Sequence, residues 1–197
     1  MFGYEPEIGI EFDVKKANEL LTRAGFKDRN KFPTIELSFN TNENHQRIAE
    51  NVQSQLKKNL GINVELKNEE WKVYLNTLQV NPAHIYRMGW LADYPDPDNF
   101  LNLMTSYSAN NHTNWGNKEY DQLIEKAASE LDANKRKQYY SKAQKILAEL
   151  DVPVAPIYSG VSQALVSKRV KNFPNNSMNR YPFKRVEIQW VRSNGVS

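Results

Sequence analysis

The stretch from Pro33 to Leu66 limits the possible folds more than any other part of the chain. It opens with apolar residues at every second position, the spacing of a strand with one buried face: Ile35, Leu37 and Phe39. Apolar residues four apart then predict a helix, and a glycine ends it: Ile48, Val52, Leu56, Leu60 and Gly61. A second strand follows with Ile62, Val64 and Leu66. This order predicts a parallel, right-handed strand-helix-strand unit.

The rest of the chain continues the alternation of helices and strands. Asp13 and Gly25 enclose a run with helical spacing, as an N-cap and a C-terminal glycine would. Apolar periodicity predicts further helices over 71–78, 120–131 and 139–150. Two prolines make the stretch 154–158 an edge strand, and the tail from Ala164 is predicted to form strands. The fold class is therefore α/β, with a mixed sheet and flanking helices.

The stretch 85–100 joins an apolar run to a polar loop. Residues Ile85 to Trp90 have no helical period, and a carboxylate, an aromatic residue and two prolines come soon after them. This pattern predicts a buried strand that ends in a rigid loop. Because binding sites are often assembled in loops that rigid strands position, we expect a site here.

Composition removes several classes of function. The chain has no cysteine, which excludes disulfides, thiolate metal sites and a cysteine nucleophile. It has no run of about eighteen apolar residues, as a membrane-spanning helix would need. The residues from Met1 onward also lack the pattern of a signal peptide. We therefore expect either a cytosolic protein or one whose export signal lies outside this sequence.

The net charge of +3 conceals a basic tail. Residues 168–197 hold seven lysines and arginines but only one acidic residue, Glu187. One interpretation is a basic nucleic-acid-binding module, whose binding would fall steeply with salt. The basic residues alternate with apolar ones, however, so solvated strands are the favoured interpretation of the tail.

One motif resembles a known family. The sequence Gly89-Trp90-x-Ala92-Asp93-Tyr94, followed by proline and by Phe100-Leu101-Asn102, is similar to a segment of the extracytoplasmic oligopeptide- and dipeptide-binding proteins of ABC importers, the family 5 solute-binding proteins. Other segments resemble the same family in the same order: 60–66 with Trp71, 120–124, 140–147 and 152–158. The resemblance covers nearly the whole chain but only the C-terminal part of family members.

The resemblance implies one lobe of a two-lobed periplasmic binding-protein-like fold. Residues 1–165 would form the second, C-terminal lobe, incomplete at its N-terminus, and tail strands in 166–197 would return toward the first lobe. An export signal would stand on the preceding part, which places the protein in the periplasm or outside the cytoplasmic membrane as an anchored protein. The chain alone is not expected to bind peptides tightly.

The resemblance also implies roles for individual residues. Asp93 would pair with the α-amine of a bound peptide, Trp90 would line a side-chain pocket, and the backbone of Gly89 to Leu91 would pair with an extended peptide. Arg87 and His45 would face the peptide carboxylate. The expected partners are a peptide, the importer's membrane permease and the first lobe, with no cofactor, metal, nucleic acid or catalysis.

Each of these residues also has a simpler interpretation. Asp93 could be a turn or cap residue, Trp90 a core residue, Arg87 the partner of a structural carboxylate and His45 a surface residue. Asp93, Asp96 and Asp98 together could form a calcium loop or the carboxylates of a hydrolase. The prolines between them, and the absence of the glycine and glutamate of a calcium loop, make both alternatives less favoured.

Overall fold

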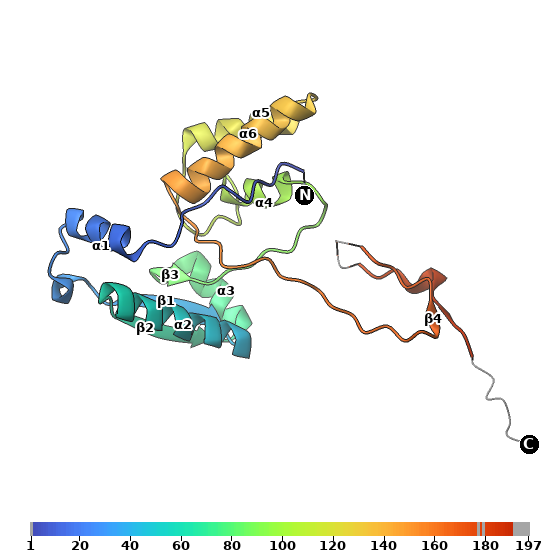
Figure 1. Cartoon of the computed structure of the whole chain (residues 1–197), viewed down its shortest axis with the longest axis horizontal. Coiled ribbons are helices and arrows are strands. Elements are labelled where there is room, and N and C mark those ends of the chain that lie inside the picture. Colours follow the sequence, from blue (N-terminus) through green and yellow to red (C-terminus); the bar gives the residue numbers. More distant parts are fainter. Residues whose placement is uncertain (1, 177, 179, 191–197) are drawn as a thin grey trace, which may run out of the picture. The chain divides into compact units, whose positions relative to one another are not determined.

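The computed structural model describes residues 2–176, 178 and 180–190. The chain divides into two compact units (Figure 1). The first unit comprises Met1–Ile8, Leu91–Thr105 and Gly116–Ser197, and the second comprises Gly9–Trp90 and Ser106–Trp115.

A parallel sheet of three strands organises the second unit. Its order is β2-β1-β3, from β1 (Ile35–Asn40), β2 (Val64–Glu69) and β3 (Ile85–Tyr86). Strand β1 pairs with β2 from Ile35↔Val64 to Asn40↔Glu69, and with β3 through Leu37↔Ile85 and Ser38↔Tyr86. The helices of this unit are α1 (Val14–Arg23), α2 (Glu43–Leu60) and α3 (Trp71–Val80). The predicted strand-helix-strand unit and its parallel pairing are confirmed.

Helix α2 and the sheet share a small apolar core. Its buried members come from β1, β2, α2 and the turn after α2: Leu37, Phe39, Ala49, Ile62 and Val64. Burying a side chain of the size of Val, Leu, Ile or Phe contributes about 1.5–3 kcal/mol. The predicted apolar face of α2 packs against this core through partly buried Val52, Leu56 and Leu60.

Local signals set both ends of α2. The Asn42 side chain accepts hydrogen bonds from the backbone N–H groups of Asn44 and His45, which satisfies donors that the helix itself cannot. Gly61 ends the helix with φ +72°, a left-handed conformation that glycine adopts without strain. A Cβ at this position would also lie 3.3 Å from the Arg29 side chain.

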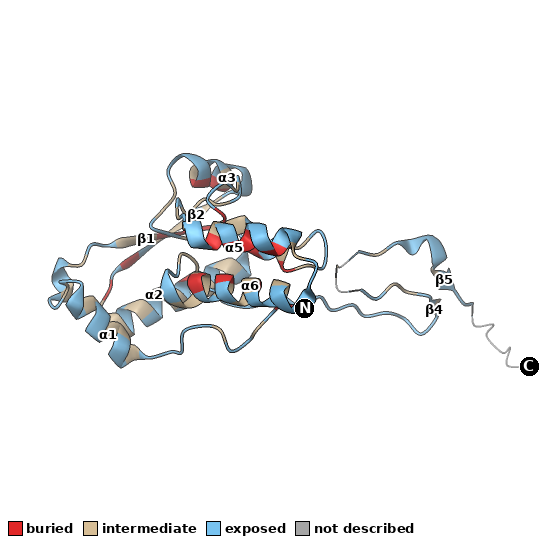
Figure 2. Ribbon diagram, turned by 90° about the horizontal axis from the view of Figure 1, so that it is seen from above, coloured by how far each residue is buried: buried red, intermediate tan, exposed pale blue. Residues whose placement is uncertain are grey.

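A helical pair dominates the first unit. Helix α5 (Lys118–Ser129) and helix α6 (Ala133–Lys145) lie side by side (Figure 1), and a π-helical turn (Ile146–Leu150) extends α6. Short helix α4 (Asp98–Leu101) continues into a 3₁₀ turn (Asn102–Met104). Figure 2 shows buried residues on α5 and α6, and these are Tyr120, Leu123, Ile124, Ala127, Tyr140 and Ala143. The helices predicted over 120–131 and 139–150 are present, with shifted ends.

Two strand predictions are wrong in whole or in part. No residue of the stretch 154–158 lies in a strand, because Pro156 removes a backbone donor and no described strand pairs with this stretch. The strands in the described part of the tail are limited to a short antiparallel pair, β4 (Val170–Lys171) with β5 (Glu187–Ile188), and a 3₁₀ turn (Phe183–Arg185) precedes β5. The strand predictions that fall on 191–197 lie outside the described residues.

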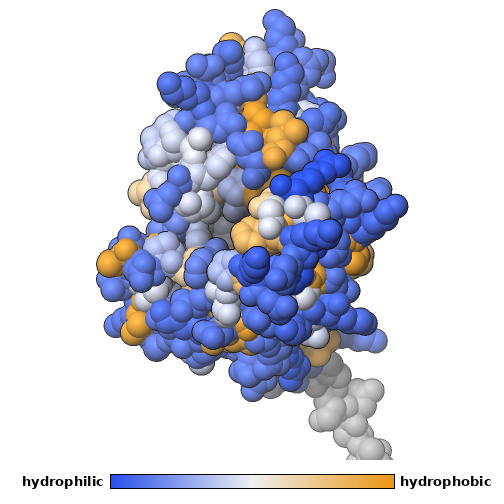
Figure 3. All heavy atoms as spheres, turned by 90° about the vertical axis from the view of Figure 1, so that its left-hand side faces the viewer, coloured by the Kyte–Doolittle hydropathy of each residue, from blue (hydrophilic) through white to orange (hydrophobic). Residues whose placement is uncertain are grey.

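The described residues contain no helix long and apolar enough to cross a membrane. The face drawn in Figure 3 is mainly hydrophilic, with hydrophobic residues in scattered groups. Nothing in the described part of the chain therefore provides a membrane-spanning helix.

Candidate functional site

The carboxyl edge of the parallel sheet brings two of the predicted site residues together. Arg87 follows β3, and its backbone N–H donates to the Ser38 carbonyl of β1 at 2.9 Å. His45 lies in the first turn of α2, with Nδ1 3.3 Å from the carbonyl oxygen of Asn40 at the end of β1. Since β2 and β3 flank β1 on opposite sides, this edge is a topological switch point, where open α/β sheets bind ligands.

The charge of Arg87 reaches His45. Burial is the main cause that lowers the pKa of His45, and the positive charge of Arg87 lowers it further, against the raising effect of the hydrogen bond to Asn40. The pair therefore favours a neutral His45 beside a permanently charged guanidinium. Such a pair can accept an anionic group with one full positive charge and a second, titratable donor.

Two neighbouring residues help to place Arg87. The hydroxyl of fully buried Tyr74, from α3, donates to the Arg87 carbonyl at 2.6 Å, and burial is the main cause that raises the pKa of Tyr74 to about 12. A Cβ on Gly89 would lie 3.1 Å from Arg87 Nη2, so the guanidinium occupies the space that the missing side chain leaves. The sequence predicted Tyr74 only as a helix residue, because nothing in local spacing shows that its hydroxyl meets Arg87.

The stretch predicted as a buried strand is mostly neither buried nor a strand. Only Ile85 and Tyr86 pair with β1, and the described residues 87–92 belong to no helix or strand. Trp90 is 40% exposed and Leu91 is 71% exposed, so Trp90 is not a core residue. Residues 87–92 stay outside the sheet because β3 lies at its edge and the pairing with β1 ends at Tyr86.

The predicted site residues fall into two groups. His45, Arg87, Gly89 and Trp90 belong to the second unit, whereas Leu91 and Asp93 belong to the first. The boundary between the units passes between Trp90 and Leu91. The structure thus brings His45, Arg87 and Gly89 together within one unit, whereas Asp93 belongs to the other.

Asp93 presents its carboxylate to solvent within the first unit. Its side chain is 76% exposed, and Arg180 Nη2 lies 4.0 Å from Oδ1 and donates to the Asp93 carbonyl at 3.2 Å. The Asp93 backbone N–H donates to Asn99 Oδ1 at 3.4 Å. Among the described residues, no residue near Asp93 in the sequence donates its backbone N–H to this carboxylate. The interpretation of Asp93 as a cap therefore has no supporting contact.

Asp96 and Asp98 are occupied by other contacts. Arg136 binds both oxygens of Asp96, at 2.8 and 2.9 Å, and the hydrogen bond from Arg136 is the main cause that holds the pKa of Asp96 below its usual value. Asp98 Oδ2 accepts from the Tyr94 hydroxyl at 2.8 Å. Within the described residues no group of three or more His, Cys, Asp or Glu side chains is placed to hold a metal. The calcium-loop and hydrolase alternatives gain no support from this geometry.

The basic tail likewise gives the nucleic-acid alternative no support. Arg169 lies over the Trp190 ring, 5.1 Å from its centroid, and donates to the Gln189 carbonyl. Arg180 contacts Asp93. Two of the basic side chains of the tail, those of Arg169 and Arg180, thus make contacts within the chain.

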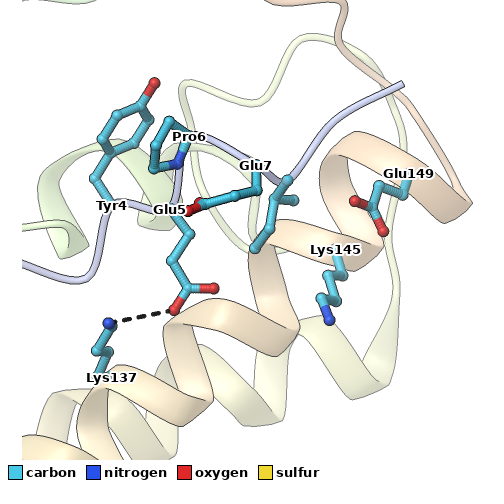
Figure 4. Close-up of a pocket in the computed structure, with 8 residues that line it drawn as sticks. Tyr4, Glu5, Pro6, Glu7, Lys137, Lys145 and Glu149 are labelled. Atoms are coloured by element: carbon cyan, nitrogen blue, oxygen red, sulfur yellow. Dashed lines mark ion pairs between the residues drawn. The ribbon is translucent and has the colours of Figure 1, made fainter. Parts of the chain in front are cut away.

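A hollow on the first unit does not involve the predicted residues. Its lining comes from the N-terminal segment, α6 and the π-helical turn: Tyr4, Glu5, Pro6, Glu7, Ile8, Lys137, Lys145 and Glu149. Figure 4 shows Lys137 pointing toward Glu5, with Nζ 3.6 Å from Oε1. The hollow is open to solvent, and its lining carries charged groups of both signs. It therefore offers no preference for a ligand of one charge.

The fold is that of an α/β protein whose parallel sheet has a candidate ligand site at its carboxyl edge, and comparisons identify its family. The family model of the bacterial extracellular solute-binding proteins, family 5, middle region, matches residues 1–112. This chain therefore belongs to the family 5 bacterial extracellular solute-binding proteins. The family that the sequence motifs resemble and the predicted fold class are confirmed.

Individual relatives are consistent with this assignment. The oligopeptide-binding protein OppA of Bacillus subtilis (strain 168) is 43% identical over 151 residues, which are 74% of this chain and 28% of that protein. The solved structure of the Escherichia coli murein tripeptide binding protein MppA matches with a TM-score of 0.78 at 35% identity, over 87% of this chain and 34% of that chain. The structure of Haemophilus influenzae OppA in complex with the peptide RPPGFSPFR has a TM-score of 0.65 at 34% identity, over 68% and 26%.

The chain spans about a third or less of the length of these relatives. They are named as binding proteins, and MppA of Escherichia coli is also described as periplasmic. The assignment of residues 1–165 to a lobe and 166–197 to a returning tail stays a prediction, and so do the roles of the site residues.

Proposed function

We propose that the protein binds peptides in an extended conformation and delivers them to the permease of an ABC importer. This chain would supply most of the C-terminal lobe, and the rest of the protein the other lobe and the export signal. The protein would act in the periplasm or anchored outside the cytoplasmic membrane, without catalysis. Support comes from relatives named for oligopeptide and murein peptide binding.

The observation that carries the proposal is the carboxyl edge of the parallel sheet. There Arg87 and His45 converge beside an edge strand, β3, which leads into the backbone of residues 87–92. A backbone stretch of this kind can pair with an extended peptide through main-chain hydrogen bonds, which are independent of peptide sequence. The adjacent cation would bind the peptide carboxylate by charge-assisted hydrogen bonds.

Asp93 would bind the other end of the peptide. Its carboxylate is exposed and its cationic neighbour, Arg180, is no closer than 4.0 Å to Oδ1. An exposed ion pair of this length contributes about 0–1 kcal/mol, so a peptide ammonium would displace Arg180 at little cost. Trp90 would line a side-chain pocket in which water fills the space that small side chains leave, and the backbone of Gly89 to Leu91 would pair with the peptide.

The test is the substitution Asp93→Asn in the full-length protein. Asn keeps the size of the side chain but removes its charge, so an ammonium in the closed site loses its partner at a cost on the order of 2–5 kcal/mol. Calorimetry with tri- to pentapeptides should show affinity at least about thirtyfold lower than that of the wild type. An N-acetylated peptide should bind the wild type poorly and should lose much less on the substitution.

Asp98→Asn, at the first residue of α4, is the matched control five positions after Asp93. Asp98 accepts from the Tyr94 hydroxyl, which an amide oxygen can also do, so peptide affinity should stay close to that of the wild type. If Asp93→Asn remains folded and binds free-amine peptides as tightly as the wild type, the role of Asp93 is wrong.

A further inference from the structure

The side chain of Arg136 on α6 binds the carboxylate of Asp96, in the loop that follows Asp93. Its Nη1 and Nη2 donate to Asp96 Oδ2 and Oδ1 at 2.8 and 2.9 Å, in the two-pronged geometry that only arginine offers. Nη2 also donates to the Tyr140 hydroxyl at 2.7 Å, and Nε donates to the Ala127 carbonyl at 3.0 Å. The Arg136 and Asp96 side chains are 24% and 29% exposed, so water screens this pair only in part.

The rings around Arg136 limit its movement. Its guanidinium carbon lies 5.0 Å from the centroid of the Tyr140 ring and 5.9 Å from that of Phe2. Tyr140 is fully buried, and its hydroxyl lies 3.3 Å from Asp96 Oδ1. Contacts with α5, α6 and the N-terminal segment therefore fix the guanidinium, and through it the position of Asp96.

Hydrogen bonds pass this restraint from Asp96 along the loop toward Asp93. Asp96 accepts from the Asp98 N–H at 3.0 Å, its own N–H donates to the Tyr94 carbonyl at 2.9 Å, and its carbonyl accepts from the Asn99 N–H at 3.1 Å. Buried Asn99 in turn accepts from the Asp93 N–H at 3.4 Å. The backbone of Asp93 is thus held by a loop whose own place is set from α6.

We propose that Arg136 is a positioning residue for ligand binding: by clamping Asp96, it holds the Asp93 carboxylate where a peptide ammonium can meet it. The inference rests on the proposed function of Asp93. It assigns a role in binding to Arg136, which lies 40 positions after Asp96 in the sequence. The clamp acts on the end of the peptide that carries the amine.

A positioning role for Arg136 and a purely structural role predict different losses of peptide affinity. Loss of the clamp leaves Asp93 charged but lets its loop move, and a misplacement of about 1 Å can weaken a charge-assisted contact severely. Only ligands that use the ammonium should then lose affinity. A purely structural role would lower the affinity for all peptides alike, or only the melting temperature.

The experiment measures trialanine and N-acetyl-trialanine binding to the full-length protein by calorimetry, and compares the ratio of the two affinities. Arg136→Gln removes the charge, and Arg136→Lys keeps the charge but not the fork. In both variants the preference for the free amine should fall at least about fivefold while binding of the acetylated peptide changes little. Asp96→Asn should reduce the ratio similarly, and the double variant Asp96→Asn/Arg136→Gln should add little, since the residues act as one unit.

Lys137→Gln is the control, because Lys137 is the next residue of α6 and forms a partly exposed pair with Glu5 of the N-terminal segment. It should keep the wild-type ratio. Circular dichroism identifies any variant that does not fold, and the milder Arg136→Lys and Asp96→Asn then carry the test. Folded variants that keep the ratio, or that lose affinity for both peptides equally, overturn the role of Arg136. A wild type without preference for the free amine would instead refute the proposed role of Asp93.

Discussion

Replacing Tyr74 by Phe removes one buried hydroxyl and leaves the ring in place. In the wild type this hydroxyl donates to the Arg87 carbonyl at 2.6 Å and lies 3.3 Å from the Ser38 carbonyl, so it joins α3 to β1 and to the residue that follows β3. The Phe variant leaves the Arg87 carbonyl without this donor. Loss of such a bond, with a buried acceptor left behind, costs about 1–2 kcal/mol of unfolding free energy near neutral pH.

The pKa of Tyr74 makes this cost depend on pH. Burial raises the pKa from 10.0 to about 12, so above pH 10 the unfolded chain releases the proton before the folded chain does. The stability that the neutral hydroxyl contributes is therefore complete below pH 10 and is lost as the pH rises through about 12. At pH 11 the wild type should have lost about 1.4 kcal/mol through this group, whereas the Phe variant has no such group to titrate.

The difference in unfolding free energy between the two proteins should thus shrink nearly to zero between pH 8 and pH 11. Urea unfolding followed by circular dichroism measures it at each pH. Tyr158→Phe is the control, since Tyr158 is exposed and its loss should change little at either pH. A difference that stays constant between the two pH values, or that is absent at pH 8, would refute the reasoning.

Two further predictions concern Gly89 and Asp96. Gly89→Ala should push the Arg87 guanidinium aside, because the new Cβ would lie 3.1 Å from Nη2. Calorimetry should then show the preference of the full-length protein for free-acid over amidated peptides reduced by roughly threefold, and an unchanged preference would contradict the packing argument. Asp96→Asn should lower the unfolding free energy at pH 6, but the difference from the wild type should narrow toward pH 3. The hydrogen bond from Arg136 lowers the pKa of Asp96 in the folded state. The stability that the Asp96 carboxylate contributes is therefore present above its unfolded pKa of 3.8 and is lost as the pH falls through its folded pKa. Urea unfolding across this range checks it, and a difference independent of pH would contradict it.

Local patterns in the sequence were enough for the parallel unit. Alternation over 35–39 and 62–66 and apolar residues four apart in α2 predicted two strands and a helix that the structure contains, because each signal depends only on which face of one element is buried. The start of α1 and the end of α2 were predictable for the same reason. Asp13 accepts from the Lys16 N–H, and Gly61 ends α2, as short-range capping requires.

Predictions failed where a strand or a helix end depends on its neighbours. Residues 87–90 are apolar enough for a strand, but β1 pairs only with Ile85 and Tyr86 of this run. Leu131 fits the helical spacing, yet α5 ends at Ser129 and Leu131 is 98% exposed. An apolar pattern indicates what could be buried, and only the presence of a packing partner decides whether it is.

The motif around Asp93 was visible in the sequence because its residues are adjacent, and the family it indicated is the one to which the chain belongs. The supports of the site were not visible. Tyr74 meets Arg87 across 13 positions, and Arg136 meets Asp96 across 40. Periodicity is a property of one element, whereas these bonds depend on where two elements meet in space. The sequence by itself thus determined the elements and the motif, and the tertiary structure decided what holds the charged groups of the motif in place.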